Sequence, residues 1–108
     1  MSTVKPIGKE NFEAEILNAK LPALLEFSAP WCTYCRRIAI PLRHMAEDLA
    51  DELVIGAVNI DEEPELAAQF AVDVIPTLYL FQNGEHGEKL VAPESRAAIE
   101  DWIHAQKK

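Results

Sequence analysis

Two cysteines lie at the junction between a short apolar strand and an amphipathic helix, and this junction narrows the possible folds more than any other feature. The segment Ala23–Ser28 is mostly apolar, which predicts a buried strand. Cys32 and Cys35 follow it directly, and apolar residues then recur at helical spacing over residues 38–49. We therefore expect Cys32 at the N-terminus of a long helix and Cys35 in its first turns.

The spacing of these cysteines, the only two in the chain, suits thiol–disulfide exchange. Two thiols three positions apart close a small ring with little loss of chain entropy, so one can attack a partner disulfide and the other can release it. Amide donors at a helix N-terminus favour the thiolate form of Cys32, and Arg36 and Arg37 add to this positive field. We expect Cys32 to be the nucleophile and Cys35, more buried and protonated, to be the resolving thiol.

Two other kinds of site use cysteine in this setting. A zinc half-site also has two cysteines with two residues between them, but zinc needs further ligands, and the chain has no second cysteine pair. His44, His86 and His104 fall in three separate predicted elements. A cysteine–histidine protease pair is disfavoured because His44 follows Cys35 by nine residues, which turns it to the opposite side of the helix. The residues favour redox chemistry, with no bound metal or cofactor.

The composition restricts the class of protein. With 108 residues, 49% of them hydrophobic, the chain is expected to form a single domain over residues 1–108 and to act as a monomer. A net charge of −8 disfavours binding to nucleic acid or anionic lipid. No bilayer-spanning window or export signal is visible, and two close cysteines do not make a secreted scaffold. We expect a cytoplasmic protein, with earlier removal of a leader as the open alternative.

Several segments predict the layers of the fold. Residues 53–58 form a nearly continuous apolar run, which predicts a strand covered on both faces and therefore helices on both sides of a sheet. Residues 12–17 predict a short helix with one buried stripe. The acidic run 61–63 precedes Pro64 and predicts an acidic cap at a helix start, where carboxylates are electrostatically favoured without any metal.

The C-terminal third predicts a hairpin followed by a helix. Residues 77–81 predict a strand, and Asn83-Gly84 is a strong hairpin signal. We expect the next four residues to loosen this turn before residues 89–92 pair back as a short strand. Ser95 is then expected to cap a final helix with one apolar stripe.

Glu26 is the polar exception in its strand. In a sheet covered on both faces, desolvation should make a lone carboxyl group hold its proton more tightly, which suits a proton-transfer group near neutral pH. The alternative is an edge strand on which Glu26 simply meets solvent. We favour the buried, functional interpretation.

Four segments together resemble the thioredoxin family, and the resemblance covers nearly the whole chain. It implies the α/β thioredoxin fold, with a central mixed five-stranded sheet flanked by four helices. It also implies reduction of protein disulfides through Cys32 and Cys35 by way of a mixed disulfide. The matching segments are Leu25-Glu26-Phe27-Ser28-Ala29-Pro30-Trp31-Cys32, Val58-Asn59-Ile60-Asp61, Ile75-Pro76-Thr77 and Phe81-Gln82-Asn83-Gly84-Glu85.

The resemblance also implies roles around the site. A cis peptide bond between Ile75 and Pro76 would face the thiols, although Pro76 taken alone indicates an ordinary trans strand opening. The backbone beside Ile75 would pair with an extended client segment, and Trp31 would supply an apolar shelf. Glu26 would take the proton of the second thiol through water. The residues placed in contact with the client are Trp31, Thr33, Tyr34, Ile75 and Pro76.

Departures from the family pattern gather near the site. Without the usual lysine at position 57, the proton of Glu26 should be held more tightly than in a common thioredoxin. The other differences are expected to alter the client groove and the redox poise. The departures are Thr33-Tyr34 for Gly-Pro, Ser28 for an aromatic residue, Ala57 for lysine and Ala92 for glycine.

Three functions stay open at this point. The favoured one is a general dithiol reductase that is recharged by a flavin-containing, NADPH-dependent thioredoxin reductase. A glutathione-linked or oxidising relative is the second, because proteins with this motif differ widely in redox potential and Tyr34 before the second cysteine is similar to glutaredoxins. The third is a non-catalytic binding module of the same fold, with idle thiols.

Overall fold

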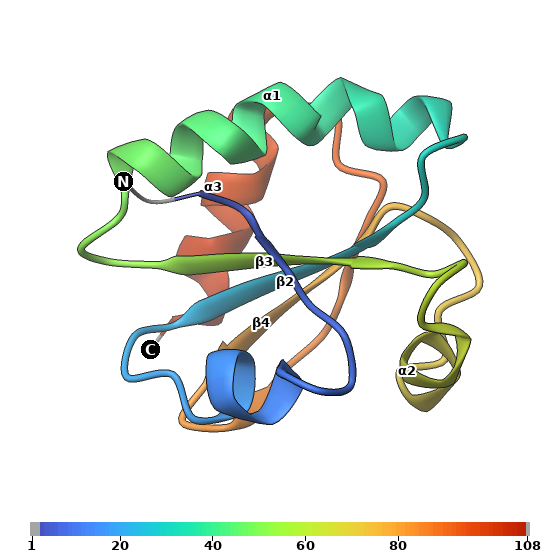
Figure 1. Ribbon diagram of the computed structural model, residues 1–108. Helices are drawn as coiled ribbons and strands as arrows, with labels where there is room; N and C mark the ends of the chain where they lie inside the picture. The colour runs from blue at the N-terminus through green and yellow to red at the C-terminus, as the bar shows by residue number, and fades with distance from the viewer. Residues whose placement is uncertain (1–2, 108) are drawn as a thin grey trace.

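The computed structural model describes residues 3–107 and shows a mixed sheet with helices on both faces (Figure 1). No helix in this part of the chain has the length and apolar character needed to cross a bilayer. The strands are β1 (Lys5–Pro6), β2 (Ala23–Ser28), β3 (Val54–Asn59), β4 (Thr77–Gln82), β5 (Glu85–His86) and β6 (Leu90–Val91). The helices are η1 (Glu13–Leu17), α1 (Thr33–Asp48), α2 (Pro64–Gln69) and α3 (Arg96–Gln106).

The strand order is β1-β3-β2-β4-β5, and β6 also pairs with β4. β1, β3 and β2 are parallel, whereas β4 runs antiparallel to β2, β5 and β6. Because β5 and β6 occupy two parts of the same edge of β4, the sheet is five strands wide. The mixed five-stranded sheet with four helices is therefore confirmed.

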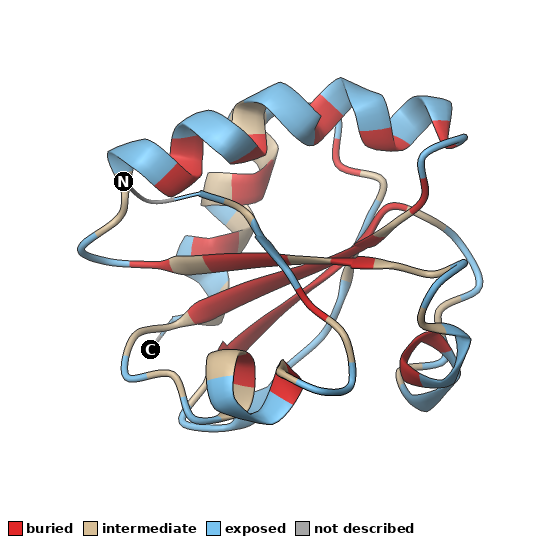
Figure 2. Ribbon diagram, in the orientation of Figure 1, coloured by how far each residue is buried: buried red, intermediate tan, exposed pale blue. Residues whose placement is uncertain are grey.

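Side chains alternate between the two faces of the central strand β2, as the pleat of a strand requires. Leu25 and Phe27 pack in one core cluster with residues of η1 and α2, and Leu24 packs in the other with residues of α1 and α3. Figure 2 shows buried residues along β2, β3 and β4 and along the inner side of α1. Glu26, two residues after Leu24, consequently faces α1.

Helix ends follow their local sequence in some places and depart from it in others. Ser95 caps α3, because its Oγ accepts the Ala98 N–H at 3.1 Å, as predicted. Pro64 is the first residue of α2 and the acidic Glu63 is its cap residue, as predicted. No side chain makes a capping hydrogen bond, however, and Glu63 instead accepts the Lys9 N–H at 3.2 Å. The short first helix, η1, is a π-helix.

The hairpin after β4 is tighter than the sequence predicts. Gln82 pairs with Glu85 and Phe81 with His86, so Asn83 and Gly84 alone form the turn. Both have positive φ angles, of 55° and 81°, which is the backbone that a two-residue turn of this kind requires. The expected loosening by residues 85–88 is therefore wrong, and β6 forms as a separate short strand.

Candidate active site

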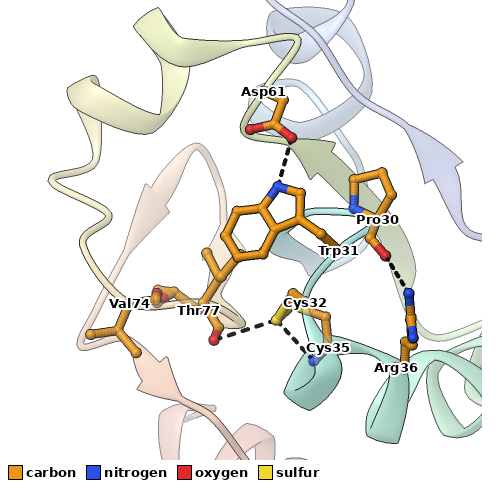
Figure 3. Close-up of a disulfide and its surroundings, with 9 residues drawn as sticks. Pro30, Trp31, Cys32, Cys35, Arg36, Asp61, Val74 and Thr77 are labelled. Carbon is orange, nitrogen blue, oxygen red and sulfur yellow. Dashed lines mark hydrogen bonds between the residues drawn. A yellow bond between two sulfur atoms is a disulfide. The ribbon is translucent and has the colours of Figure 1, made fainter.

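The start of α1 positions the two cysteines. Cys32 has an extended backbone and is the cap residue of the helix, and its Sγ accepts the Cys35 N–H at 3.1 Å (Figure 3). A cap position brings a side-chain acceptor onto the unpaired amides of the first turn. Sulfur takes this acceptor role here, so negative charge on Cys32 lies where amide dipoles converge.

The two sulfurs are joined in a disulfide, with 5.3 Å between the Cα atoms of Cys32 and Cys35. Both residues are buried, each with 5% of its surface exposed. They form a small apolar cluster with Ala29, against which Ile60 and Ile75 pack. Exposure therefore does not distinguish the two cysteines in the oxidised state, and the expectation that Cys35 is the more buried is wrong for this form.

The loop before β4 approaches Cys32 from the other side. The peptide bond between Ile75 and Pro76 is cis, as the resemblance implies, and the Ile75 carbonyl oxygen lies 3.7 Å from the Cys32 Sγ. Two hydrogen bonds hold the loop: the Thr77 hydroxyl donates to the Val74 carbonyl, and the Ala92 N–H donates to the Pro76 carbonyl at 2.8 Å. The loop thus presents backbone groups beside the reactive sulfur.

Trp31 lies beside the disulfide and is largely solvent-exposed, with 61% of its surface accessible. Its indole N–H donates to the Asp61 carboxylate at 2.8 Å, which fixes the ring (Figure 3). Thr33 and Tyr34 are exposed on the first turn of α1. The guanidinium of Arg37 lies 5.2 Å from the centre of the Tyr34 ring, within the range of a cation–π contact. The Trp31–Asp61 bond gives no signal in the sequence, because its partners are thirty residues apart.

Glu26 lies behind the disulfide, on the central strand of the sheet, with 6% of its surface exposed. The edge-strand alternative is therefore wrong. Burial raises the pKa of its carboxyl group from 4.5 to about 7, and no charged neighbour contributes to the shift. Ala57 is its register partner on β3, so no cation stands there.

A cavity of about 310 Å³ connects Glu26 with Cys35. Its lining also includes Ser28, Arg36 and Asn59. This volume is large enough to hold several water molecules. The cavity opens behind the disulfide, where Cys35 and not Cys32 forms part of the wall, so the two cysteines have different surroundings.

The three histidines do not approach the cysteines. His44 and His104 are exposed on α1 and α3, and the ring of His86 packs against Tyr79 with 4.8 Å between ring centres. Within residues 3–107, no three His, Cys, Asp or Glu side chains are grouped so that they could hold a metal ion.

Comparisons with known proteins agree with this geometry. The family model for thioredoxin matches residues 3–105. The chain is 34% identical to thioredoxin of Rickettsia bellii over 98 residues, which cover 91% of this chain and 93% of that one. It is 34% identical to thioredoxin 1 of Synechococcus elongatus, over 95% of this chain and 96% of that one. It is 35% identical to thioredoxin of Acidithiobacillus ferridurans, over 93% of each chain.

Proposed function

This chain belongs to the thioredoxin family, and we propose that it works as a reductase of protein disulfides in which Cys32 attacks and Cys35 resolves. The family's chemistry makes it a thiol–disulfide oxidoreductase whose substrates are disulfides of other proteins. The observation that carries the proposed roles is the hydrogen bond from the Cys35 N–H to the Cys32 Sγ at 3.1 Å. This donor favours the thiolate of Cys32, which is the attacking species.

The proposed cycle has two exchange steps. The Cys32 thiolate attacks one sulfur of the client disulfide, forms a mixed disulfide and releases the other client sulfur, which takes up a proton. Cys35 then loses its proton and attacks the Cys32 Sγ, which frees the second client thiol and leaves the Cys32–Cys35 disulfide. Two electrons and two protons pass to the client. The 5.3 Å between the Cα atoms of the two cysteines lets the disulfide close without a large backbone movement.

Glu26 is proposed to accept the proton of Cys35 through water in the cavity that both residues line. A pKa of about 7 allows the carboxyl group to accept and return a proton near neutral pH. Burial of the strand raises the pKa of Glu26 into this range, and Ala57, its partner on β3, supplies no positive charge that would lower it. Glu26 therefore assists the second step and leaves the first unaffected.

The client is proposed to lie across the surface around Cys32. Trp31 offers an apolar shelf held by Asp61, and the backbone of Ile75 and Pro76 offers hydrogen-bonding groups to an extended segment. Thr33 and Tyr34 border this surface on α1. As in the family generally, a reductase must return electrons to the disulfide; for this chain we propose an NADPH-dependent thioredoxin reductase. We further propose a monomer in the cytoplasm with no nucleic-acid or membrane partner, in keeping with a site built within one chain and a net charge of −8.

Reduction of insulin by the reduced protein tests the proposed roles. The unmodified protein is expected to reduce insulin, Cys32→Ser to be inactive, and Cys35→Ser to accumulate a mixed disulfide between Cys32 and insulin. Mass spectrometry identifies the bonded cysteine. A client bond that forms on Cys35 in the Cys32→Ser variant as readily as on Cys32 in the other would reverse the roles. If the unmodified protein did not reduce insulin, the non-catalytic binding module would be the remaining interpretation.

The direction of exchange is tested separately by equilibrating the cysteine pair against a redox buffer. A dithiol reductase is expected to have a reduction potential of about −270 mV, whereas that of an oxidising relative is about −120 mV. Turnover with NADPH and thioredoxin reductase supports the proposed donor. Turnover with glutathione alone would identify the glutathione-linked alternative.

A further inference from the structure

Residues 33–43 of α1 carry a concentration of positive charge in an otherwise acidic protein. The chain has 10 Lys and Arg against 18 Asp and Glu, yet Arg36, Arg37 and Arg43 are all exposed on this part of the helix. No acidic residue occurs in α1 before Glu47. These three arginines, called the arginine face below, form a local field opposite in sign to that of the whole molecule.

Two of the arginines have contacts near the start of α1. Arg36 donates from its Nη2 to the Pro30 carbonyl at 3.1 Å, which places its charge beside the loop that leads to Cys32. Figure 3 shows Arg36 and Val74 on opposite sides of Cys32. Arg37 lies against the exposed Tyr34 ring and is 4.0 Å from the exposed carboxylate of Glu94. Such a long, exposed ion pair contributes little, so another carboxylate can replace it.

Exposed apolar side chains adjoin the arginine face. Two lie at the start of α1, one lies further along this helix, and two flank the loop that contains Ile75 and Pro76. An extended segment can therefore place apolar residues next to its cystine and still reach the guanidinium groups with residues further along. The large apolar residues in question are Trp31, Tyr34, Ile40, Val74 and Val91.

We propose that the arginine face selects client disulfides flanked by acidic residues, an inference that rests on the proposed function and specifies its substrate class. Guanidinium groups bind carboxylates through paired, directed hydrogen bonds, and Arg36 uses one of its donors on Pro30 and keeps others for a client. The net charge of −8 opposes an acidic client only weakly at physiological salt. The screening length there is about 8 Å, so distant carboxylates are screened whereas groups in contact are not.

Three synthetic peptides test the proposal. Each is closed by one disulfide, and they differ only in three flanking positions, which are all Glu, all Gln or all Lys. The second-order rate constant for oxidation of the reduced protein by each peptide is measured at about 0.15 M salt, where the screening length is about 8 Å. The Glu peptide is expected to react about tenfold faster than the Lys peptide, the lower end of electrostatic rate effects. In 1 M salt, with a screening length of about 3 Å, the ratio should approach one.

Matched variants locate the effect. Changing Arg36, Arg37 and Arg43 together to Gln should bring the ratio of Glu to Lys peptide rates to about one. The control variant changes three lysines to Gln, namely Lys5 on β1 and Lys9 and Lys20 between β1 and β2. It alters the net charge by as much as the arginine variant does and should preserve the ratio. A ratio of two rates cancels any change in the reactivity of Cys32 itself. The salt dependence of the unmodified protein tests the proposal even if a triple variant does not fold.

The outcomes separate the two proposals. If the Gln peptide is reduced but the Lys peptide reacts as fast as the Glu peptide, the acidic-client proposal is overturned and the reductase stands. A preference that survives the arginine changes would also overturn it. If none of the three peptides is reduced, the proposed function itself fails.

Discussion

Glu26 gives this protein a pH dependence that arises from a single side chain. It lies on the central strand, faces α1 and has no charged neighbour that offsets its burial. Its pKa is consequently raised from 4.5 to about 7. In the unfolded chain the same group is solvated, so the folded state binds this proton more tightly than the unfolded state does. Stability must then fall as the pH rises through this interval.

Replacing Glu26 by Gln removes this dependence. Below pH 4.5 the carboxyl group is protonated in both states, and above about pH 7 it is ionised in both, so the destabilisation develops between the two values. At about 1.4 kcal/mol per pKa unit, the full loss is about 3 kcal/mol. Urea unfolding of oxidised Glu26→Gln should therefore show a stability advantage over the unmodified protein that grows by about 3 kcal/mol from pH 4.5 to about pH 8. Glu62→Gln, at an exposed position, controls for the lost charge, and parallel pH curves for Glu26→Gln and the unmodified protein would contradict this account.

For single residues, the sequence predicts whether a side chain is buried better than it predicts which other residue that side chain contacts. A lone carboxyl group in an apolar strand was sufficient to predict that Glu26 is buried and that its pKa is raised. The partnership of Trp31 with Asp61 depends on the meeting of two loops, which no local pattern specifies. The equal exposure of Cys32 and Cys35 also could not be predicted, because the shielding of Cys32 comes from Ile75, forty-three residues away.

Two elements end in alanines with a left-handed backbone. α2 closes with the Ala71 N–H bonded to the Ala68 carbonyl and the Val72 N–H to the Ala67 carbonyl, both at 3.0 Å. This arrangement requires a positive φ angle at Ala71, which is 52°. Ala92, after β6, has a φ angle of 47° while its N–H holds the Pro76 carbonyl. A Cβ atom is unfavourable at both positions, where glycine is the usual residue.

Glycine at either position should stabilise the fold. Ala71→Gly and Ala92→Gly each relieve a clash of about 1–2 kcal/mol and lose about 0.4–1 kcal/mol through the greater freedom of the unfolded chain. A net gain of about 0.5–1 kcal/mol in the free energy of unfolding is expected, measured in urea. Ala68→Gly, in the helical part of α2, is the matched control and should be destabilising, by up to about 1 kcal/mol. Loss of stability in all three variants would show that the positive φ angles carry no strain.

Elements with a strong period were predictable, and their ends were less so. The bounds of β2, Ala23–Ser28, are those that the apolar run predicts. The first helix was predicted, but its π geometry, with the Asn18 N–H bonded to the Glu13 carbonyl at 2.9 Å, was not. Apolar spacing reports which side chains are buried and is insensitive to one extra residue in a turn. Glu63 occupies the cap position of α2 that the acidic run predicts, but its carboxylate bonds the Lys9 N–H, a contact made only in the folded chain.

On the scale of the whole molecule, the residues predict layers and the resemblance implies a mixed five-stranded sheet, whereas the order of the strands was not predicted. The apolar run at residues 53–58 correctly places helices on both faces, but nothing in its spacing specifies that β3 lies between β1 and β2. That order sets the function. It brings the end of β2, which leads into Cys32, next to the start of β4, which follows Pro76, because Phe27 pairs with Thr77. The distribution of charge is also a property of the whole molecule: the protein is acidic overall, yet arginines lie beside its reactive cysteine.

The central claim is that this fold makes Cys32 the attacking thiolate and keeps Cys35 for the second step. Timed alkylation of the fully reduced protein near neutral pH, with a small uncharged reagent and mass spectrometry of each cysteine peptide, tests it directly. We predict that Cys32 is modified first and that Cys35 reacts substantially only after unfolding. Equal rates at the two cysteines, or earlier modification of Cys35, would contradict the account.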